Sequence, residues 1–132
     1  MQIQEKIMHV KDIMSAPVTS CTIDSNVGRV RDLMYLKGFS ALPVVEVHED
    51  EIKIKGIVTY RDVAGVYDDN ISVRQVMTQR VWVIPPHTNV KTAADLMRKK
   101  EIHHLVVVDQ GRIVGLLSSA DFVELVSKFQ LC

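Results

Sequence analysis

A stretch near the start of this 132-residue chain recurs, with little change in spacing, in its second half. Residues 10–46 align with residues 73–109 at a constant offset of 63, and twelve of these 37 positions are identical. The first copy then carries four extra residues, after which residues 56–63 align with residues 115–122 at an offset of 59. A segment of about sixty residues is marginal alone, whereas two related copies can bury their apolar faces against each other. The duplication therefore predicts two similar folded repeats.

Both copies give the same order of secondary-structure signals. In the first copy, apolar periodicity and β-branched runs predict a helical turn, a strand, a helix, two strands and a last helix, at residues 10–14, 18–22, 26–37, 41–47 and 52–59 and from Tyr60. The equivalent segments of the second copy are residues 73–77, 81–85, 89–100, 105–109 and 112–118 and a helix from Ser119. This predicts an α+β fold made of two βαββα repeats.

Residues typical of helix caps and of loops set the expected boundaries of these elements. Ser25 and Thr88 directly precede the two long helices and are the predicted N-caps. The Asp-Asp-Asn cluster between the copies is a loop signal. We therefore expect a first repeat over residues 7–66, a linker over residues 67–72 and a second repeat over residues 73–129. The apolar spacing of Phe122, Leu125, Val126 and Phe129 predicts an amphipathic C-terminal helix.

Charge and composition narrow the classes of function. Sixteen basic residues balance sixteen acidic residues, so nothing favours nucleic acid or an anionic membrane as the main partner. No apolar run has the length of a membrane span and the N-terminus has no signal-like apolar core, which predicts a cytoplasmic protein. Cys21 and Cys132 show neither metal nor redox spacing, so both are expected to be reduced thiols.

Four motifs carry a family resemblance. They are GFSALPVV at residues 38–45, GIVTYRD at 56–62, EIHHLVVVD at 101–109 and GLLSSAD at 115–121. In residues 10 to about 126, the chain resembles a pair of CBS domains, the unit called a Bateman module, standing alone without a catalytic domain. The resemblance implies repeats packed through their sheets with pseudo-twofold symmetry, and two clefts that bind AMP, ADP, ATP or S-adenosylmethionine. It also implies a homodimer that senses a ligand and regulates an as yet unidentified protein, with no required cofactor and no catalysis.

The hydroxyl–aspartate pairs at the ends of the repeats are the central candidates. A carboxylate accepts two hydrogen bonds at a spacing that suits the vicinal diol of a ribose, and the next helix directs N–H groups at a phosphate. The resemblance assigns these roles to Ser118 and Asp121 in the main cleft and to Thr59 and Asp62 in the second cleft. The same spacing is also the capping-box pattern, which predicts helix capping with or without a ligand.

Two adjacent histidines mark the main cleft. Nucleotide-binding relatives often have His-Arg at the positions of His103 and His104, and contact phosphates there. Histidine is fully charged only near pH 6.5 or below unless an anion is bound, so this departure predicts weaker ATP binding with a pH-dependent affinity. Adjacent residues of a strand point to opposite faces, so the two imidazoles are not expected to form a metal site. Two partly exposed histidines at the start of a strand are the alternative.

The resemblance implies further residues in each cleft, although a place in the ordinary core is the alternative for the apolar ones. The main cleft is expected to combine the histidines and the Ser118–Asp121 pair with Met14, Pro17, Thr19, Phe39, Ser40 and Ala41. The second cleft is expected to combine the Thr59–Asp62 pair with Arg61, Met77, Arg80, Val81, Trp82 and Ile102. For the two arginines a solvated surface position is the alternative.

Two functional hypotheses remain open from the sequence. The first is a ligand-sensing regulatory module, and the second is a constitutive dimerisation or protein-interaction module whose clefts are empty or degenerate. The sequence shows no Gly-rich phosphate loop, no nucleophile–base pair and no cluster with metal-ligand spacing, so no enzyme is predicted.

Overall fold

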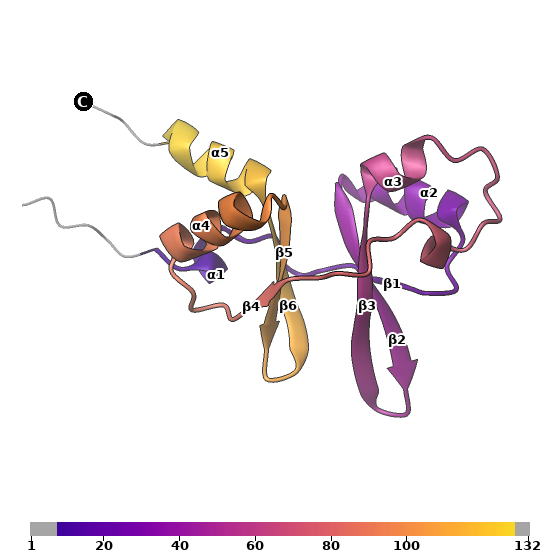
Figure 1. The fold of residues 1–132 in the computed structure, drawn as a ribbon, viewed down its shortest axis with the longest axis horizontal. Coiled ribbons are helices and arrows are strands. Elements are labelled where there is room, and N and C mark those ends of the chain that lie inside the picture. The colour runs from indigo at the N-terminus through magenta and orange to yellow at the C-terminus, as the bar shows by residue number, and fades with distance from the viewer. Residues whose placement is uncertain (1–7, 129–132) are drawn as a thin grey trace, which may run out of the picture. The chain divides into compact units, whose positions relative to one another are not determined.

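The computed structural model describes residues 8–128, which form two compact units (Figure 1). One unit, which we call unit 2, consists of residues 19–81. The other, unit 1, combines residues 8–18 with residues 82–128. The first ten or so residues of each sequence copy, its leading segment, thus belong to the unit that the other copy mainly builds. The sequence copies and the compact units are therefore different partitions of the same chain.

Unit 2 is a three-stranded sheet with helices. In it, β1 pairs in parallel with β2, and β2 pairs in an antiparallel manner with β3. Figure 1 shows the hairpin projecting away from the helices, which lie near the end of the sheet where β3 stops. Its elements are β1 (Cys21–Thr22), α2 (Val27–Lys37), β2 (Ala41–His48), β3 (Glu51–Thr59), α3 (Tyr60–Ala64) and the 3-10 turn η1 (Val73–Gln75).

Unit 1 has the same arrangement. Its sheet has the order β4-β5-β6, again with one parallel and one antiparallel pairing. Its elements are α1 (Val10–Ile13), β4 (Val83–Ile84), α4 (Val90–Lys100), β5 (His104–Asp109), β6 (Arg112–Ser118) and α5 (Ser119–Lys128). The predicted α+β class, with two related repeats that each hold a three-stranded sheet and helices, is confirmed. Phe129 and Cys132, which the sequence analysis also considered, lie outside the described residues.

The two units repeat each other in register, including their irregularities. The ladder of each hairpin is interrupted at equivalent points, between Val44 and Val45 and between Val107 and Val108. The leading segments dock through equivalent isolated bridges, Ser15 with Leu116 in unit 1 and Thr78 with Ile57 in unit 2. The offsets of 63 and 59 found in the sequence relate both pairs. The structure therefore supports the same alignment that the sequence suggested.

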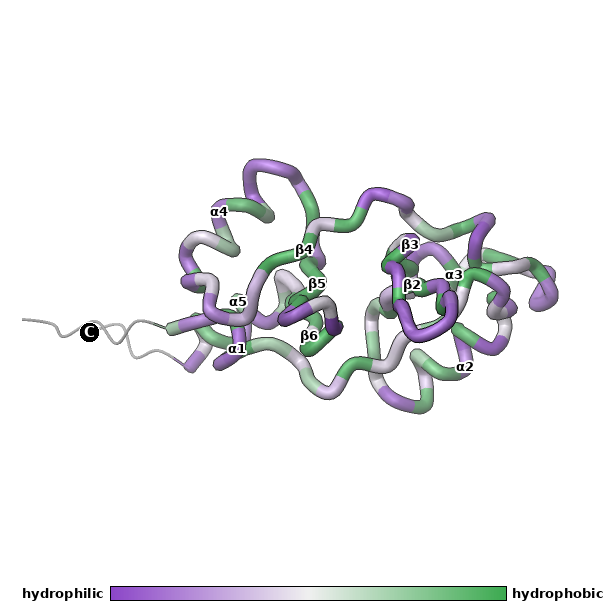
Figure 2. The backbone as a smooth tube through the Cα atoms, turned by 90° about the horizontal axis from the view of Figure 1, so that it is seen from below, coloured by the Kyte–Doolittle hydropathy of each residue, from purple (hydrophilic) through white to green (hydrophobic). Residues whose placement is uncertain are grey.

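Each unit has its own apolar core, and no polar side chain is buried among the described residues. Figure 2 shows the apolar residues concentrated on the strands. The core of unit 2 joins α2 to β2 and β3 through residues such as Met34, Leu42 and Val58. The core of unit 1 joins Val10 of its leading segment to α4 and the strands, through Leu105 and Leu117 among others. Docking of Val10 makes the leading segment part of the core itself.

The predicted N-caps of the two long helices are wrong by one residue. The caps are Asn26 and Asn89, and the Asn89 side chain accepts a hydrogen bond from the Lys91 N–H at 2.8 Å. Ser25 is engaged elsewhere, because its hydroxyl oxygen accepts the Thr22 N–H at 3.0 Å. The carbonyls of Ser25 and Thr88 accept the N–H groups of Val73 and Val10, at 2.8 Å each. These two residues thus hold the leading segments rather than capping helices.

The helices of the described region are short. The longest, α2 and α4, each contain 11 residues. A membrane-spanning helix needs about 20 mostly apolar residues, and within residues 8–128 no helix meets that requirement.

Candidate ligand-binding site

A hydroxyl–aspartate pair lies where the last strand of each unit meets the following helix. In unit 2 the Asp62 carboxylate accepts the Thr59 N–H at 2.8 Å, and the Thr59 hydroxyl accepts the Asp62 N–H at 3.3 Å. In unit 1 the Asp121 carboxylate accepts the Ser118 N–H at 2.8 Å and the Ser118 hydroxyl at 3.3 Å. Both aspartates use only Oδ2 in these bonds. Among the described residues, none donates to either Oδ1, so capping leaves one carboxylate oxygen for another donor.

Unit 1 gathers six of the ten residues predicted for the main cleft. Ser15 and Leu116 exchange backbone hydrogen bonds of 2.9 and 3.0 Å, which holds the leading segment against β6. Met14 consequently packs against the unit 1 core and over Gly115, where its side chain occupies the space of a Cβ. The six residues are Met14, Pro17, His103, His104, Ser118 and Asp121, and the other four, Thr19, Phe39, Ser40 and Ala41, belong to unit 2.

A pocket of about 460 Å³ lies elsewhere in the chain, and a smaller one of about 390 Å³ adjoins His103. The smaller pocket is bounded by the last turn of α4 and the first residue of α5. Ser119 donates its N–H to the His103 carbonyl at 2.9 Å, and its hydroxyl lies 3.5 Å from His103 Nδ1. The residues that line it are Met97, Arg98, Glu101, Ile102, His103 and Ser119.

Arg98 is the residue that the sequence reasoning missed. The sequence lacks an arginine directly after His103, but α4 brings Arg98 to the same pocket from five residues upstream. Its guanidinium lies 3.9 Å from the Asp95 carboxylate, beyond hydrogen-bond distance, and its side chain is largely exposed. The apolar spacing of α4 could have indicated it, because Met97 is a core residue and Arg98 follows it at the helix end. Ile102, predicted for the second cleft, also lines this pocket.

The equivalent surface of unit 2 has a different chemistry. At the positions of Arg98, His103 and Ser119 the first copy has Tyr35, Ser40 and Tyr60. The backbone is the same there, since Tyr60 donates its N–H to the Ser40 carbonyl at 2.8 Å. Tyr35 and Tyr60 are 85% and 53% exposed, so this surface presents tyrosine rings where unit 1 has Arg98 and Ser119. The two junctions are thus built alike and differ in the ligand groups they can attract.

The residues predicted for the second cleft are divided between the units. Thr59, Arg61, Asp62, Met77, Arg80 and Val81 belong to unit 2, whereas Trp82 and Ile102 belong to unit 1. Met77 packs against the unit 2 core, as Met14 does in unit 1. Trp82 packs against the unit 1 core, and the Lys100 ammonium lies 5.0 Å from the centre of its ring. Its indole therefore already has a cation–π partner.

Comparison with known proteins identifies the family. The family model described as CBS domain matches twice, at residues 10–69 and 73–128. The chain belongs to the CBS domain family. A CBS-containing chain can be one part of a larger enzyme, and the curated relatives show this. The inosine-5'-monophosphate dehydrogenase of Methanocaldococcus jannaschii is 29% identical over 131 residues, which are 94% of this chain but 26% of that protein.

A second dehydrogenase is likewise matched by this chain over only a small part of its length. The inosine-5'-monophosphate dehydrogenase of Schizosaccharomyces pombe is 37% identical over 101 residues, 74% of this chain and 19% of that protein. This chain therefore spans about a quarter or less of the length of these dehydrogenases. The similarity covers the CBS pair of this chain and does not by itself bring the dehydrogenase activity with it.

Solved CBS structures match over nearly the whole of both chains. The CBS domain pair of protein MJ0100, in complex with 5'-methylthioadenosine and S-adenosyl-L-methionine, is 27% identical with a TM-score of 0.81, covering 92% of this chain and 98% of that one. A signal-transduction protein with CBS domains from Burkholderia ambifaria is 29% identical with a TM-score of 0.77, covering 95% and 98%.

Proposed function

We propose that this chain is a non-catalytic regulatory module that binds an adenosine-containing ligand. The observation that carries the proposal is the junction of β6 and α5, where Asp121 caps the helix with one carboxylate oxygen and keeps the other for a ligand. A similar CBS pair, that of MJ0100, binds two adenosine compounds, which supports the ligand class. The main cleft is a better candidate for the adenosine site than the second cleft, because its hydroxyl–aspartate junction adjoins the pocket that contains Arg98 and His103.

Each part of the ligand has a proposed partner. Asp121 Oδ1 accepts the ribose hydroxyls, and Ser118 adds a contact at the strand end. The adenine lies against Met14 and Pro17 of unit 1. His103, which lines the pocket beside Arg98, contacts the anionic end of the ligand. The second cleft uses Thr59 and Asp62 in the same way.

The identity of the ligand depends on the charge at its 5' end. AMP, ADP and ATP carry phosphates, which suit the N–H donors of Arg98 and His103 in this pocket. S-adenosylmethionine and 5'-methylthioadenosine, the ligands of the MJ0100 pair, carry no phosphate. Glu101 also lines the pocket and opposes a highly charged ligand. We therefore propose that a ligand with a single phosphate, AMP, binds more tightly than ATP.

Thermal shift with matched variants tests the proposal. A ligand that binds only the folded state, at a hundredfold over its dissociation constant, adds about 2.7 kcal/mol of stability. Asp121→Asn and Asp62→Asn both weaken a helix cap, so each lowers the Tm of the ligand-free protein. Only Asp121→Asn is expected to abolish the ligand-induced rise for the main cleft. The absence of any rise with all five adenosine compounds at millimolar concentration would refute the proposal.

The alternative function, a constitutive dimerisation or protein-interaction module, also has an observation in its favour. Tyr35 and Leu36 on α2 are 85% and 79% exposed, and Val123 and Val126 on α5 are 70% and 60% exposed. Exposed apolar side chains that form a contiguous patch commonly mark protein contacts. We propose that a homodimer uses such surfaces, and light scattering with and without adenosine ligands distinguishes the two functions. A ligand-independent dimer that shows no thermal shift would favour the interaction module.

A further inference from the structure

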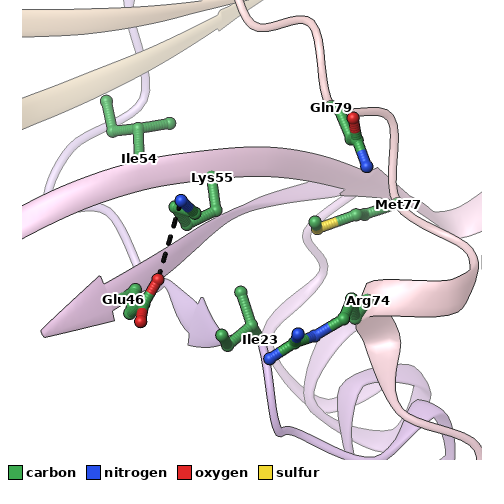
Figure 3. A pocket seen from close by; sticks show the side chains of 7 residues that line it. All are labelled: Ile23, Glu46, Ile54, Lys55, Arg74, Met77 and Gln79. Carbon is green, nitrogen blue, oxygen red and sulfur yellow. Dashed lines mark ion pairs between the residues drawn. The ribbon is translucent and has the colours of Figure 1, made fainter.

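Unit 2 contains a polar pocket that the adenosine-binding proposal does not use. Its volume is about 460 Å³, within the usual range for small-molecule sites. It lies at the face where the turn after β1, the hairpin strands and the segment after η1 meet (Figure 3). Neither Thr59 nor Asp62 lines it, and among the residues predicted for the second cleft it includes Met77.

The two cationic side chains of this pocket each have an ion-pair partner at a distance longer than a hydrogen bond. Arg74 Nη2 lies 3.7 Å from Asp24 Oδ1, and Lys55 Nζ lies 3.7 Å from Glu46 Oε2. Both distances exceed that of a hydrogen bond, so neither contact uses an N–H donor fully. Asp24 is 87% exposed and can turn away into water, whereas Glu46 is also held by His48 at 2.7 Å. Arg74 is therefore the cation most available to a new anion.

The rest of the lining combines an amide with an apolar surface. Figure 3 shows the Glu46–Lys55 pair on one side of the pocket and Arg74, Met77 and Gln79 on the other, with the guanidinium of Arg74 directed toward Ile23. Ile54 and the thioether of Met77 complete the apolar part. With two cations and one carboxylate, the lining carries one net positive charge. A ligand that fits it has one negative charge and a short apolar body.

The duplication shows which polar residues of the lining are specific to unit 2. Unit 1 has Val114 at the strand position of Lys55 and Ala16 at the position of Gln79. Both units nevertheless form the same sheet and dock their leading segments through the same bridges. At the positions of Arg74 and Glu46, however, unit 1 has the like-charged Lys11 and Asp109. Lys55 and Gln79 are therefore the polar lining residues that the second copy does not repeat.

We propose that this pocket binds a small organic monocarboxylate with an apolar chain. The carboxylate accepts two N–H groups of the Arg74 guanidinium in a bidentate pair. The apolar chain packs on Ile23, Ile54 and Met77. The pocket shares Met77 with the predicted second cleft but has no residue in common with the main cleft, so its failure or success leaves the main-cleft proposal to its own test.

The experiment is an NMR titration of the whole chain with 4-methylpentanoate and with its neutral amide, which has nearly the same shape. We expect saturable shifts of the Arg74, Gln79 and Met77 signals with the carboxylate, and none with the amide at equal concentration. Inorganic phosphate, an anion without an apolar chain, is expected to shift the same signals at least tenfold less efficiently. Equal responses to the carboxylate and the amide, or no saturable response to the carboxylate, would overturn the proposal.

Two arginine variants test whether the carboxylate binds in this pocket. Arg74→Gln is expected to weaken carboxylate binding about tenfold or more, which is the scale of one charge-assisted hydrogen bond. Arg29→Gln, which removes an exposed arginine of the same unit outside this pocket, is expected to leave binding unchanged. Both side chains are exposed, so both variants should fold, as their Tm values will show. Equal affinities for the two variants would also overturn the proposal.

Discussion

The aspartate of each hydroxyl–aspartate pair has two tasks that one carboxylate can perform together. Its Oδ2 accepts a hydrogen bond at the first turn of the helix, and its Oδ1 is the oxygen that we propose for a ligand. Sequence reasoning held capping and ligand binding to be compatible in one residue pair. The carboxylate accepts the N–H of the hydroxyl residue in both units, and the complete capping box is present in unit 2. The difference between the units lies in neighbouring residues, since Arg98 and His103 have Tyr35 and Ser40 as counterparts.

Arg98 is expected to distinguish phosphorylated from unphosphorylated ligands. If it contacts a phosphate, Arg98→Ala should weaken AMP binding about tenfold while the affinity for 5'-methylthioadenosine stays the same. Lys99→Ala removes the neighbouring charge from the same helix turn, outside the pocket, and is the control. Isothermal titration calorimetry measures the affinity of each variant for AMP and for 5'-methylthioadenosine. An equal loss for both ligands, or an equal effect of Lys99→Ala, would contradict a phosphate contact.

Cys21 predicts how stability depends on alkaline pH. Burial raises the pKa of its thiol to about 11 from an ordinary value of 9.0. The folded state thus favours the neutral thiol, so its contribution is complete below pH 9 and is lost as the pH rises toward 11. Urea unfolding at pH 8 and pH 10.5 should show a loss larger by about 1–3 kcal/mol in the natural protein than in Cys21→Val. The same pH dependence in both proteins would show that Cys21 is not the cause.

At the scale of elements, the leading segments depend on glycines in the third strands. A Cβ added at Gly56 would lie 2.7 Å from the Thr78 carbonyl oxygen and 2.7 Å from Met77 Sδ. That carbonyl also accepts the Ile57 N–H at 2.9 Å, so it cannot move without breaking the bridge. The glycine of the motif GIVTYRD thus permits the close approach of two backbones.

Gly56→Ala should therefore destabilise the protein by about 2–3 kcal/mol, because the leading segment must shift to admit the methyl group. Gly65→Ala is the matched control in the same unit, since nothing lies within 4 Å of its added Cβ and its φ is −96°. That variant should change the free energy of unfolding by less than about 0.5 kcal/mol, or slightly raise it. Chemical denaturation measures both, and similar values for the two would refute a close approach at Gly56.

The sequence predicted the positions of the helices and strands better than it predicted which distant residues these elements contact. Periodicity and β-branched runs located the strands and helices because these signals are local. The N-caps were misplaced by one residue. Ser25 and Thr88 lie just before the caps, and their backbone carbonyls accept the N–H groups of Val73 and Val10, some fifty to eighty residues away. Arg98 was missed for a similar reason, since only the folded turn between α4 and β5 brings it to the pocket of His103.

At the scale of the whole molecule, the copies have exchanged their leading segments. Each unit takes its first core-forming turn from the other copy, as Val10 does in unit 1 and Val73 in unit 2. A sequence copy is therefore an incomplete folding unit, although the alignment alone made it seem the natural one. This dependence explains physically why the repeat occurs as a pair.

Two fragments of nearly equal length test this exchange. Residues 19–81 contain the complete unit 2, whereas residues 7–66 contain the first copy with the wrong leading segment. We expect the first fragment to show dispersed NMR signals and a cooperative urea transition, and the second to show neither, although both are near the lower size limit for independent folding. A fragment 7–66 that is as ordered as fragment 19–81 would contradict the exchange.

The most direct test of the central claim, that the junction of β6 and α5 binds the ribose of an adenosine ligand, is a crystal structure of the chain grown with AMP or S-adenosylmethionine. We predict a ribose whose hydroxyls lie within about 2.6–3.2 Å of the Asp121 carboxylate, with the Ser118–Asp121 cap intact. A ligand bound away from Asp121, or crystals that remain without ligand at saturating concentration, would contradict the account.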